Sequence, residues 1–203
     1  GNTTYKTTGT GTTDAPIDTA SARRIVETYL KSQSVDLTLY RTDGEDYVDD
    51  DNIISADGST TIRFYYDRQT YLVSFASNLT SGLDKVPENT SYRWGSDVSV
   101  EVEVSAGYTL NSFTATNADD ELIEDLIQQS GTNPYTITFT MPTNAFTINI
   151  NISANTNTSY TVVYRFRTPD GSGFVDDLEF EITKSGTTGV LLTEDMIGYI
   201  ENM

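Results

Sequence analysis

The sequence of 203 residues contains neither cysteine nor histidine. Without cysteine, the chain has no disulfides, no thiol nucleophile and no cysteine-based zinc site. Without histidine, it has no histidine-dependent catalytic triad and no imidazole ligand for a metal. No glycine-rich phosphate-binding loop precedes an expected helix. We therefore expect no enzymatic activity and no cofactor. Paired carboxylates, as used in glycoside hydrolysis, are the catalytic chemistry that the composition leaves open.

Basic residues are also scarce. The chain has 12 lysines and arginines against 30 aspartates and glutamates, which gives a net charge of −18. This charge argues against binding to nucleic acid, whose phosphates need Lys and Arg, and against adsorption to anionic membranes. No apolar run reaches the length of a membrane span. The chain begins at Gly1 without an apolar leader, and we interpret it as a mature or trimmed fragment.

Leucine and alanine are sparse, whereas threonine, asparagine, serine and tyrosine are abundant. Threonine and tyrosine suit strands that have one face in water, so the composition favours β-sheet over helix. We expect a mainly β (α+β) fold. Its units would be small β-grasp-like modules in tandem, each a short mixed sheet with at most one helix.

The first part of the chain predicts a small sheet with one packed helix. The Thr/Gly-rich stretch Thr3–Thr13 could be a linker, but we expect a strand that ends in a turn at Gly9–Thr13. Asp18 can cap a helix over Thr19–Ser32. That helix would bury one apolar stripe, formed by Ile25, Val26, Tyr29 and Leu30. Val35–Tyr40 and Thr61–Tyr66 are expected to be strands.

The second part, from about Thr70, predicts several strands and one further helix. Asp97–Val104 has strict alternation of valine with polar residues, which is typical of a half-buried strand. The other expected strands are Tyr71–Ala76, Leu110–Ala115, Tyr135–Met141 and Phe146–Ile152. Asp119–Gln129 is expected to be helical because its apolar residues form one stripe: Leu122, Ile123, Leu126 and Ile127.

The last part predicts a hairpin and a second copy of the chain's own beginning. Tyr160–Arg167 and Leu178–Thr183 flank the turn signal Pro169–Gly171, and a short helix is expected over Thr193–Ile200. Three residues recur at an offset of 175, namely Gly11 at Gly186, Thr12 at Thr187 and Thr13 at Thr188. The expected helix caps Asp18 and Thr193 have the same offset. Self-similarity at a fixed offset is the mark of an array.

The offset predicts that the chain is out of phase with its repeat. The first module would lack its opening hairpin and the last would lack its closing strands. Each end would then expose a sheet edge that another chain can complete, giving head-to-tail self-association. The alternative is that Thr3–Gly9 supplies the first module's missing strand.

Two stretches carry a family resemblance. The run ISADGSTTIRFYYDR resembles the closing strand of mucin-binding-protein-like (MucBP-like) repeats of Gram-positive bacteria. The runs VSVEVEVSAGYTLNSF and NPYTITFTMPTNAFTINI resemble a divergent internalin-type B-repeat, apart from the insert at Asn117–Ser130. The resemblance implies a MucBP-like module over residues 1–69, a B-repeat module over 70–154 and the opening part of a further MucBP-like module over 155–203.

The resemblance also implies a location and a style of function. Such repeats belong to secreted or wall-attached proteins, where they act as adhesive or stalk modules. A protein or glycan on a host or neighbouring cell would be the partner. The alternative is a carbohydrate-binding module attached to an extracellular polysaccharide-degrading protein, which would need an exposed row of aromatic side chains.

Two groups of residues are candidate sites, each with a structural alternative. Tyr92 and Trp94 could stack on a sugar, or Trp94 could pack in the core. The acidic run contains weak candidates for calcium, although its spacing is not that of a calcium loop, and the alternative is a solvated loop: Asp43, Glu45, Asp49 and Asp51. We expect the lysines Lys31, Lys85 and Lys184 to be ordinary surface residues rather than isopeptide donors.

Overall fold

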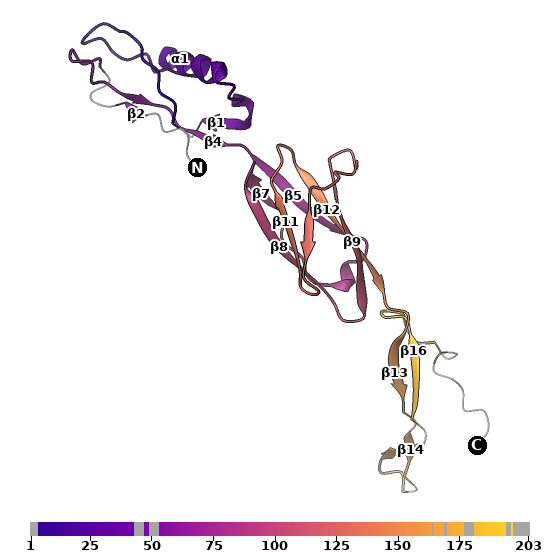
Figure 1. The fold of residues 1–203 in the computed structure, drawn as a ribbon. Helices are drawn as coiled ribbons and strands as arrows, with labels where there is room; N and C mark the ends of the chain where they lie inside the picture. The colour runs from indigo at the N-terminus through magenta and orange to yellow at the C-terminus, as the bar shows by residue number, and fades with distance from the viewer. Residues whose placement is uncertain are drawn as a thin grey trace. The chain divides into compact units, whose positions relative to one another are not determined.

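The structure is a computed structural model that describes residues 4–42, 47–48, 53–163, 165–168, 170–176, 181–193 and 196. The described part is mainly β, with several small sheets and the α-helix α1 (Thr19–Ser32) (Figure 1). The chain divides into two compact units. Unit 1 comprises Gly1–Leu72, Ser91–Ser96 and Thr140–Asn144, and unit 2 comprises the rest.

Helix α1 has the bounds that the sequence predicts. The Asp18 carboxylate accepts hydrogen bonds from the backbone N–H groups of Ala20 and Ser21, both at 3.1 Å, which confirms the cap. Leu30 is buried, with 6% of its surface exposed. Ile25, however, is 52% exposed, so the buried stripe is narrower than predicted. The Arg23 guanidinium instead lies over the Phe64 ring, 4.6 Å from its centre.

The strands of unit 1 are shorter than predicted. The structure has the 3₁₀ turn η1 (Leu37–Leu39) where a strand was expected, because the Asp36 carboxylate accepts from the Thr38 N–H at 3.0 Å and holds a turn. The expected strand Thr61–Tyr66 is broken into β3 (Ile62–Arg63) and β4 (Tyr66–Arg68). β4 pairs antiparallel with β1 (Tyr40–Thr42), and β3 pairs with β2 (Tyr47–Val48).

The start of the chain differs from the strand predicted for it. Residues 4–15 form no strand, so Thr3–Gly9 supplies no strand to the first module over the described residues. The end of the segment instead makes an isolated antiparallel β-bridge between Pro16 and Ile53, outside the named strands, and Asp14 and Ala15 form backbone hydrogen bonds with Ile54. Proline lacks an N–H donor, which limits how far such pairing can extend.

Two four-stranded sheets form the larger β-region. One has the order β10-β11-β8-β6 and the other β7-β5-β12-β9. The elements are β5 (Thr70–Ser77), η2 (Thr80–Gly82), β6 (Leu83–Lys85), β7 (Thr90–Arg93), β8 (Asp97–Val104), β9 (Tyr108–Thr116), β10 (Gln128–Ser130), β11 (Tyr135–Thr140) and β12 (Phe146–Ala154). The five predicted strands of this region are therefore confirmed, with end shifts of a few residues. β12 pairs parallel with β5 and antiparallel with β9.

The inward faces of these strands form the core of unit 2. Alternate residues of β12 are almost fully buried, since Phe146, Ile148, Ile150 and Ile152 are 3%, 0%, 0% and 1% exposed. The Phe139 ring of β11 meets the Phe146 ring edge to face, with centroids 5.2 Å apart. These contacts join the two sheets.

The predicted helix over Asp119–Gln129 is wrong. Residues 117–127 form an irregular loop whose Leu122 makes a β-bridge with Thr116. The Asn117 side-chain oxygen accepts from the N–H groups of Asp119 and Glu121, both at 2.9 Å, and Asp120 has a φ of 60°. This turn chemistry competes successfully with helix formation.

The C-terminal part of unit 2 contains two short two-stranded sheets. β13 (Thr158–Val162) pairs with β16 (Ile182–Gly186), and β14 (Arg165–Arg167) pairs with β15 (Phe174–Asp176). The predicted hairpin around Pro169–Gly171 is confirmed in part. Residues 177–180 of its expected second strand, and most of the expected helix Thr193–Ile200, lie outside the described residues.

Two of the stretches that the 175-residue offset pairs form the same local turn. In the first copy, the Ala15 N–H donates to the Thr12 carbonyl at 3.1 Å. In the second, the Val190 N–H donates to the Thr187 carbonyl at 3.2 Å. The residue before each donor has a positive φ, 60° at Asp14 and 77° at Gly189, which aspartate and glycine tolerate better than most residues. The same turn therefore occurs twice, 175 residues apart.

Candidate functional site

Trp94, the predicted sugar-stacking residue, follows β7 in unit 1 and is half-buried. Its indole N–H donates to the Leu39 carbonyl at 2.7 Å. Its ring meets Tyr40 edge to face, with centroids 5.8 Å apart, and the Arg68 guanidinium lies 6.0 Å from the ring centre. Both the polar edge and the ring of Trp94 are thus engaged inside the protein.

Asp67 lies beside this tryptophan and binds two arginines. Its carboxylate accepts from Arg93 Nε at 2.8 Å and from Arg93 Nη2 at 2.9 Å, a two-point contact. It also accepts from Arg41 Nη2 at 3.0 Å. The hydrogen bonds from Arg93, and next those from Arg41, hold the pKa of the Asp67 carboxyl well below its usual range.

Backbone hydrogen bonds tie the same segments together. Gln69 donates its N–H to the Leu39 carbonyl at 2.8 Å and accepts from the Trp94 N–H at 3.0 Å. The Gly95 N–H donates to the Met141 carbonyl at 2.7 Å. We call Leu39, Tyr40, Asp67, Gln69, Arg93 and Trp94 the Trp94 cluster. It fixes three parts of unit 1 that are remote in sequence, at 39–41, 67–69 and 93–95.

Tyr92, the other predicted ligand residue, lies on β7 and is half-buried. It is two residues from Trp94 and makes interactions of its own within the protein. A sugar-binding role for Tyr92 and Trp94 stays a prediction. Trp94 makes contacts within the protein but is half-buried, so the alternative that it packs in the core also stays a prediction.

The acidic candidates for calcium, Asp43, Glu45, Asp49 and Asp51, lie outside the described residues. Within the described ranges, no group of three or more acidic side chains is arranged to hold a metal ion. Of the three lysines, Lys85 donates to Glu101 at 2.7 Å and Lys184 to the Met196 carbonyl at 2.9 Å.

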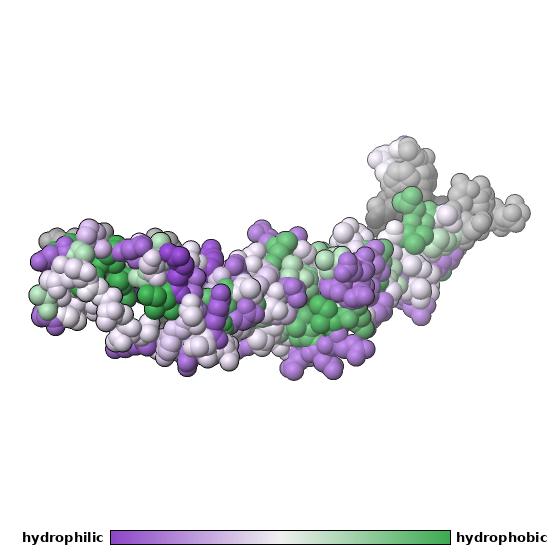
Figure 2. Space-filling model, turned by 90° about the horizontal axis from the view of Figure 1, so that it is seen from above, coloured by the Kyte–Doolittle hydropathy of each residue, from purple (hydrophilic) through white to green (hydrophobic). Residues whose placement is uncertain are grey.

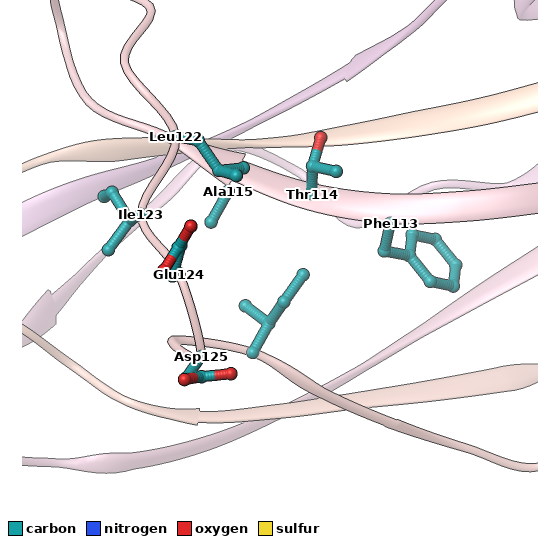
Figure 3. Close-up of a pocket in the computed structure, with 8 residues that line it drawn as sticks. Phe113, Thr114, Ala115, Leu122, Ile123, Glu124 and Asp125 are labelled. Carbon is teal, nitrogen blue, oxygen red and sulfur yellow. The ribbon is translucent and has the colours of Figure 1, made fainter.

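A shallow hollow of about 300 Å³ lies between β9 and the 117–127 loop of unit 2. Figure 3 shows Phe113, Thr114 and Ala115 along the strand, Leu122 close to Ala115, and Ile123, Glu124 and Asp125 along the loop. The loop contributes Leu122, Ile123, Glu124, Asp125 and Ile127. This volume is at the low end for ligand pockets, and apolar walls with an acidic rim suit only a small cationic or apolar group. Sequence reasoning missed the hollow because it placed a helix here.

The surface view shows hydrophilic residues over much of the visible face, with hydrophobic residues in separate patches (Figure 2). Among the residues that the structure describes, no helix combines the length and the apolar character needed to cross a membrane. No family model, curated protein or solved structure matches the chain.

Proposed function

We propose that the chain is a non-enzymatic repeat region of an extracellular bacterial protein, secreted or attached to the cell wall, whose modules act as adhesive or stalk elements. The observation that carries this proposal is the repeated turn at Thr12–Ala15 and Thr187–Val190, with matching hydrogen bonds and matching positive φ. An array of modules that are each stable through local contacts is the physical basis of stalks.

The Trp94 cluster supports the stalk role. Its ion pairs and backbone bonds hold separate segments of unit 1 in one arrangement, which suits a protein that must resist bending or pulling. The large negative charge supports a solvated, extracellular surface that repels nucleic acid and anionic membranes.

The experiment is to label intact cells of the producing organism with antibody raised against the purified chain. Labelling is expected without lysis, and protease added to intact cells is expected to remove the epitope while a cytoplasmic marker persists. Labelling that requires lysis would contradict the proposal.

The alternative role as a carbohydrate-binding module is weakened by the contacts of Trp94, whose N–H and ring are both used internally. A glycan array with the natural chain and with Trp94→Phe separates the two roles. If the chain is a stalk, the natural chain should give no reproducible glycan signal that is lost in Trp94→Phe.

A further inference from the structure

The two copies of the repeated turn differ in what covers the segment that follows. In the first copy, the Asp14 N–H donates to the Ile54 carbonyl at 3.0 Å, and the Ile54 N–H donates to the Ala15 carbonyl at 3.2 Å. Pro16 then bridges Ile53. A Cβ added at Gly11 would collide with the Ile54 side chain, so that side chain also lies against the start of the turn. We call the stretch that follows each turn an arm. The first arm, Asp14–Ile17, is therefore covered by Ile53 and Ile54.

The second arm, Gly189–Leu192, is largely exposed to solvent. Val190, Leu191 and Leu192 are 55%, 87% and 48% exposed. Within the described residues, no strand hydrogen bond reaches the Gly189 N–H or the Val190 carbonyl, the groups equivalent to those that Ile54 binds in the first copy. Three consecutive exposed aliphatic residues, beside backbone groups that pair with no strand of the described chain, form an edge that another segment can pair with.

The base of this arm is held in place. The Thr188 N–H donates to the Asn155 carbonyl at 2.9 Å, and the Thr158 and Thr188 hydroxyls lie 2.6 Å apart. The Asn155 N–H in turn donates to the Gly107 carbonyl at 2.8 Å. Because the base of the arm is already fixed, the arm loses less conformational entropy when a partner binds, and it is preorganised for binding.

We propose that the Gly189–Leu192 arm is the acceptor for the Ile53–Ser55 segment of a second copy of this chain, paired as Asp14–Pro16 pairs with Ile53 and Ile54. The occupant follows from the repeat, because Ile53 and Ile54 are the residues that cover the equivalent arm. Each copy carries one acceptor and one donor segment at different places, so the association is head to tail.

In the second chain, the Ala15–Ile17 stretch already pairs with the Ile53–Ser55 segment and therefore competes with the acceptor for it. That stretch offers Ala15, Pro16 and Ile17, whereas the acceptor offers Val190, Leu191 and Leu192. The acceptor is larger and more apolar, and Leu191 has an N–H where Pro16 has none. The intramolecular competitor nevertheless acts at an effective concentration of roughly millimolar. We therefore expect association only at high protein concentration, and a free peptide to bind at lower concentration.

The first experiment measures binding of a fluorescent peptide, Ile53–Thr60 (IISADGST), to the full chain by anisotropy, with a scrambled peptide as control. Saturable binding of the natural peptide is expected. Val190→Asp should weaken it by at least about tenfold, because the exchange places a charge in the apolar contact. Val86→Asp is the matched control, since Val86 is 41% exposed at another site, and it should leave the affinity unchanged.

The second experiment is sedimentation of the full chain from micromolar to millimolar concentration. Growth of head-to-tail species is expected for the natural chain and for Val86→Asp, and it should be lost in Leu191→Asp. Circular dichroism of each variant checks that the fold is intact, which is expected because the arm is exposed.

Absence of peptide binding would overturn the proposal. Peptide binding without association, or association that survives Leu191→Asp, would overturn the second copy as the occupant. The inference rests on the repeat that also carries the proposed function, but surface labelling of intact cells decides that function independently. A monomeric protein that labels intact cells would refute the acceptor and leave the extracellular role standing.

Discussion

Asp67 holds two arginines that are distant in the sequence, Arg41 and Arg93, and this makes one carboxylate important for unit 1. The three side chains differ in solvent exposure: the Asp67 side chain is 22% exposed, and those of Arg41 and Arg93 are 53% and 54% exposed. The pKa of Asp67 is lowered in the folded state, so its bonds contribute stability above its ordinary value near 3.8. That contribution is lost as the pH falls below this value towards the folded pKa.

We therefore expect Asp67→Asn to lower the midpoint of urea unfolding at pH 7. The difference from the natural chain should shrink as the pH falls below about 4, because the natural carboxyl is then protonated in the unfolded state and progressively in the folded one. Urea titrations followed by circular dichroism at several pH values provide the measurement. Asp119→Asn, at an exposed position, is the charge-matched control. A pH-independent difference would refute the assignment to these ion pairs.

Asn78 acts as a substitute for a strand neighbour. Its Nδ2 donates to the Ile152 carbonyl and its Oδ1 accepts from the Ile152 N–H, both at 2.9 Å. Asn133 makes the same pair of bonds with Val104 on the other sheet, at 2.9 and 3.0 Å. Amide side chains suit this role because they carry a donor and an acceptor side by side.

The nearly isosteric change Asn78→Asp should therefore cost about 1–3 kcal/mol, since it keeps the acceptor but turns a carboxylate oxygen towards the Ile152 carbonyl. Urea unfolding at pH 7 gives the value. Asn157→Asp, at an exposed turn position, is the control and should change stability by less than about 0.5 kcal/mol. Equal effects of the two substitutions would contradict the pairing role.

At the scale of elements, the predictions that succeeded depend on local chemistry. α1 was placed within Thr19–Ser32 because Asp18 is a strong cap, and β8 was placed at Asp97–Val104 because valine alternates strictly with polar residues. In both, the residues that determine the element lie within it or next to it.

The failures occurred where two structures satisfy the same pattern. Leu122, Ile123 and Ile127 form a helical stripe, yet a loop that folds over β9 brings apolar side chains to the same hollow. The Asn117 side chain favours the loop by binding backbone N–H groups of the next turn. The Trp94 cluster was not predictable in detail, because Leu39, Asp67 and Arg93 come together only through tertiary pairing.

β12 is the element on which the larger β-region depends most. It lies between β5 and β9 and pairs with both (Figure 1). Its inward residues are almost fully buried. Ile150→Ala should therefore cost about 2–5 kcal/mol, as is usual for truncation in a packed core. Ile182→Ala, the same substitution at a residue that is 44% exposed, should cost much less. Urea unfolding followed by circular dichroism compares them, and similar losses would show that Ile150 is not in a packed core.

For the whole molecule, the dominant property is a net charge of −18 carried by a chain with a sequence pI near 4.1. Repulsion between copies of like charge opposes every weak contact, including the proposed pairing of the Gly189–Leu192 arm with the Ile53–Ser55 segment of a second chain. Screening by salt reduces this repulsion, since the Debye length falls from about 30 Å at 0.01 M to about 8 Å at 0.15 M. Added salt at pH 7 should accordingly strengthen association that depends on the arm.

The same charge sets the pH dependence of solubility. At pH 7 and low salt the natural chain should stay soluble at high concentration, because nearly all carboxylates are ionised. As the pH falls towards about 4, protonation brings the net charge close to zero, and solubility should pass through a minimum near the sequence pI. Turbidity and the concentration left after centrifugation, measured from pH 3 to pH 8, test this. The Leu191→Asp variant should show the same minimum, because the arm contributes little to the net charge, whereas precipitation of the natural chain at neutral pH and low salt would contradict the argument.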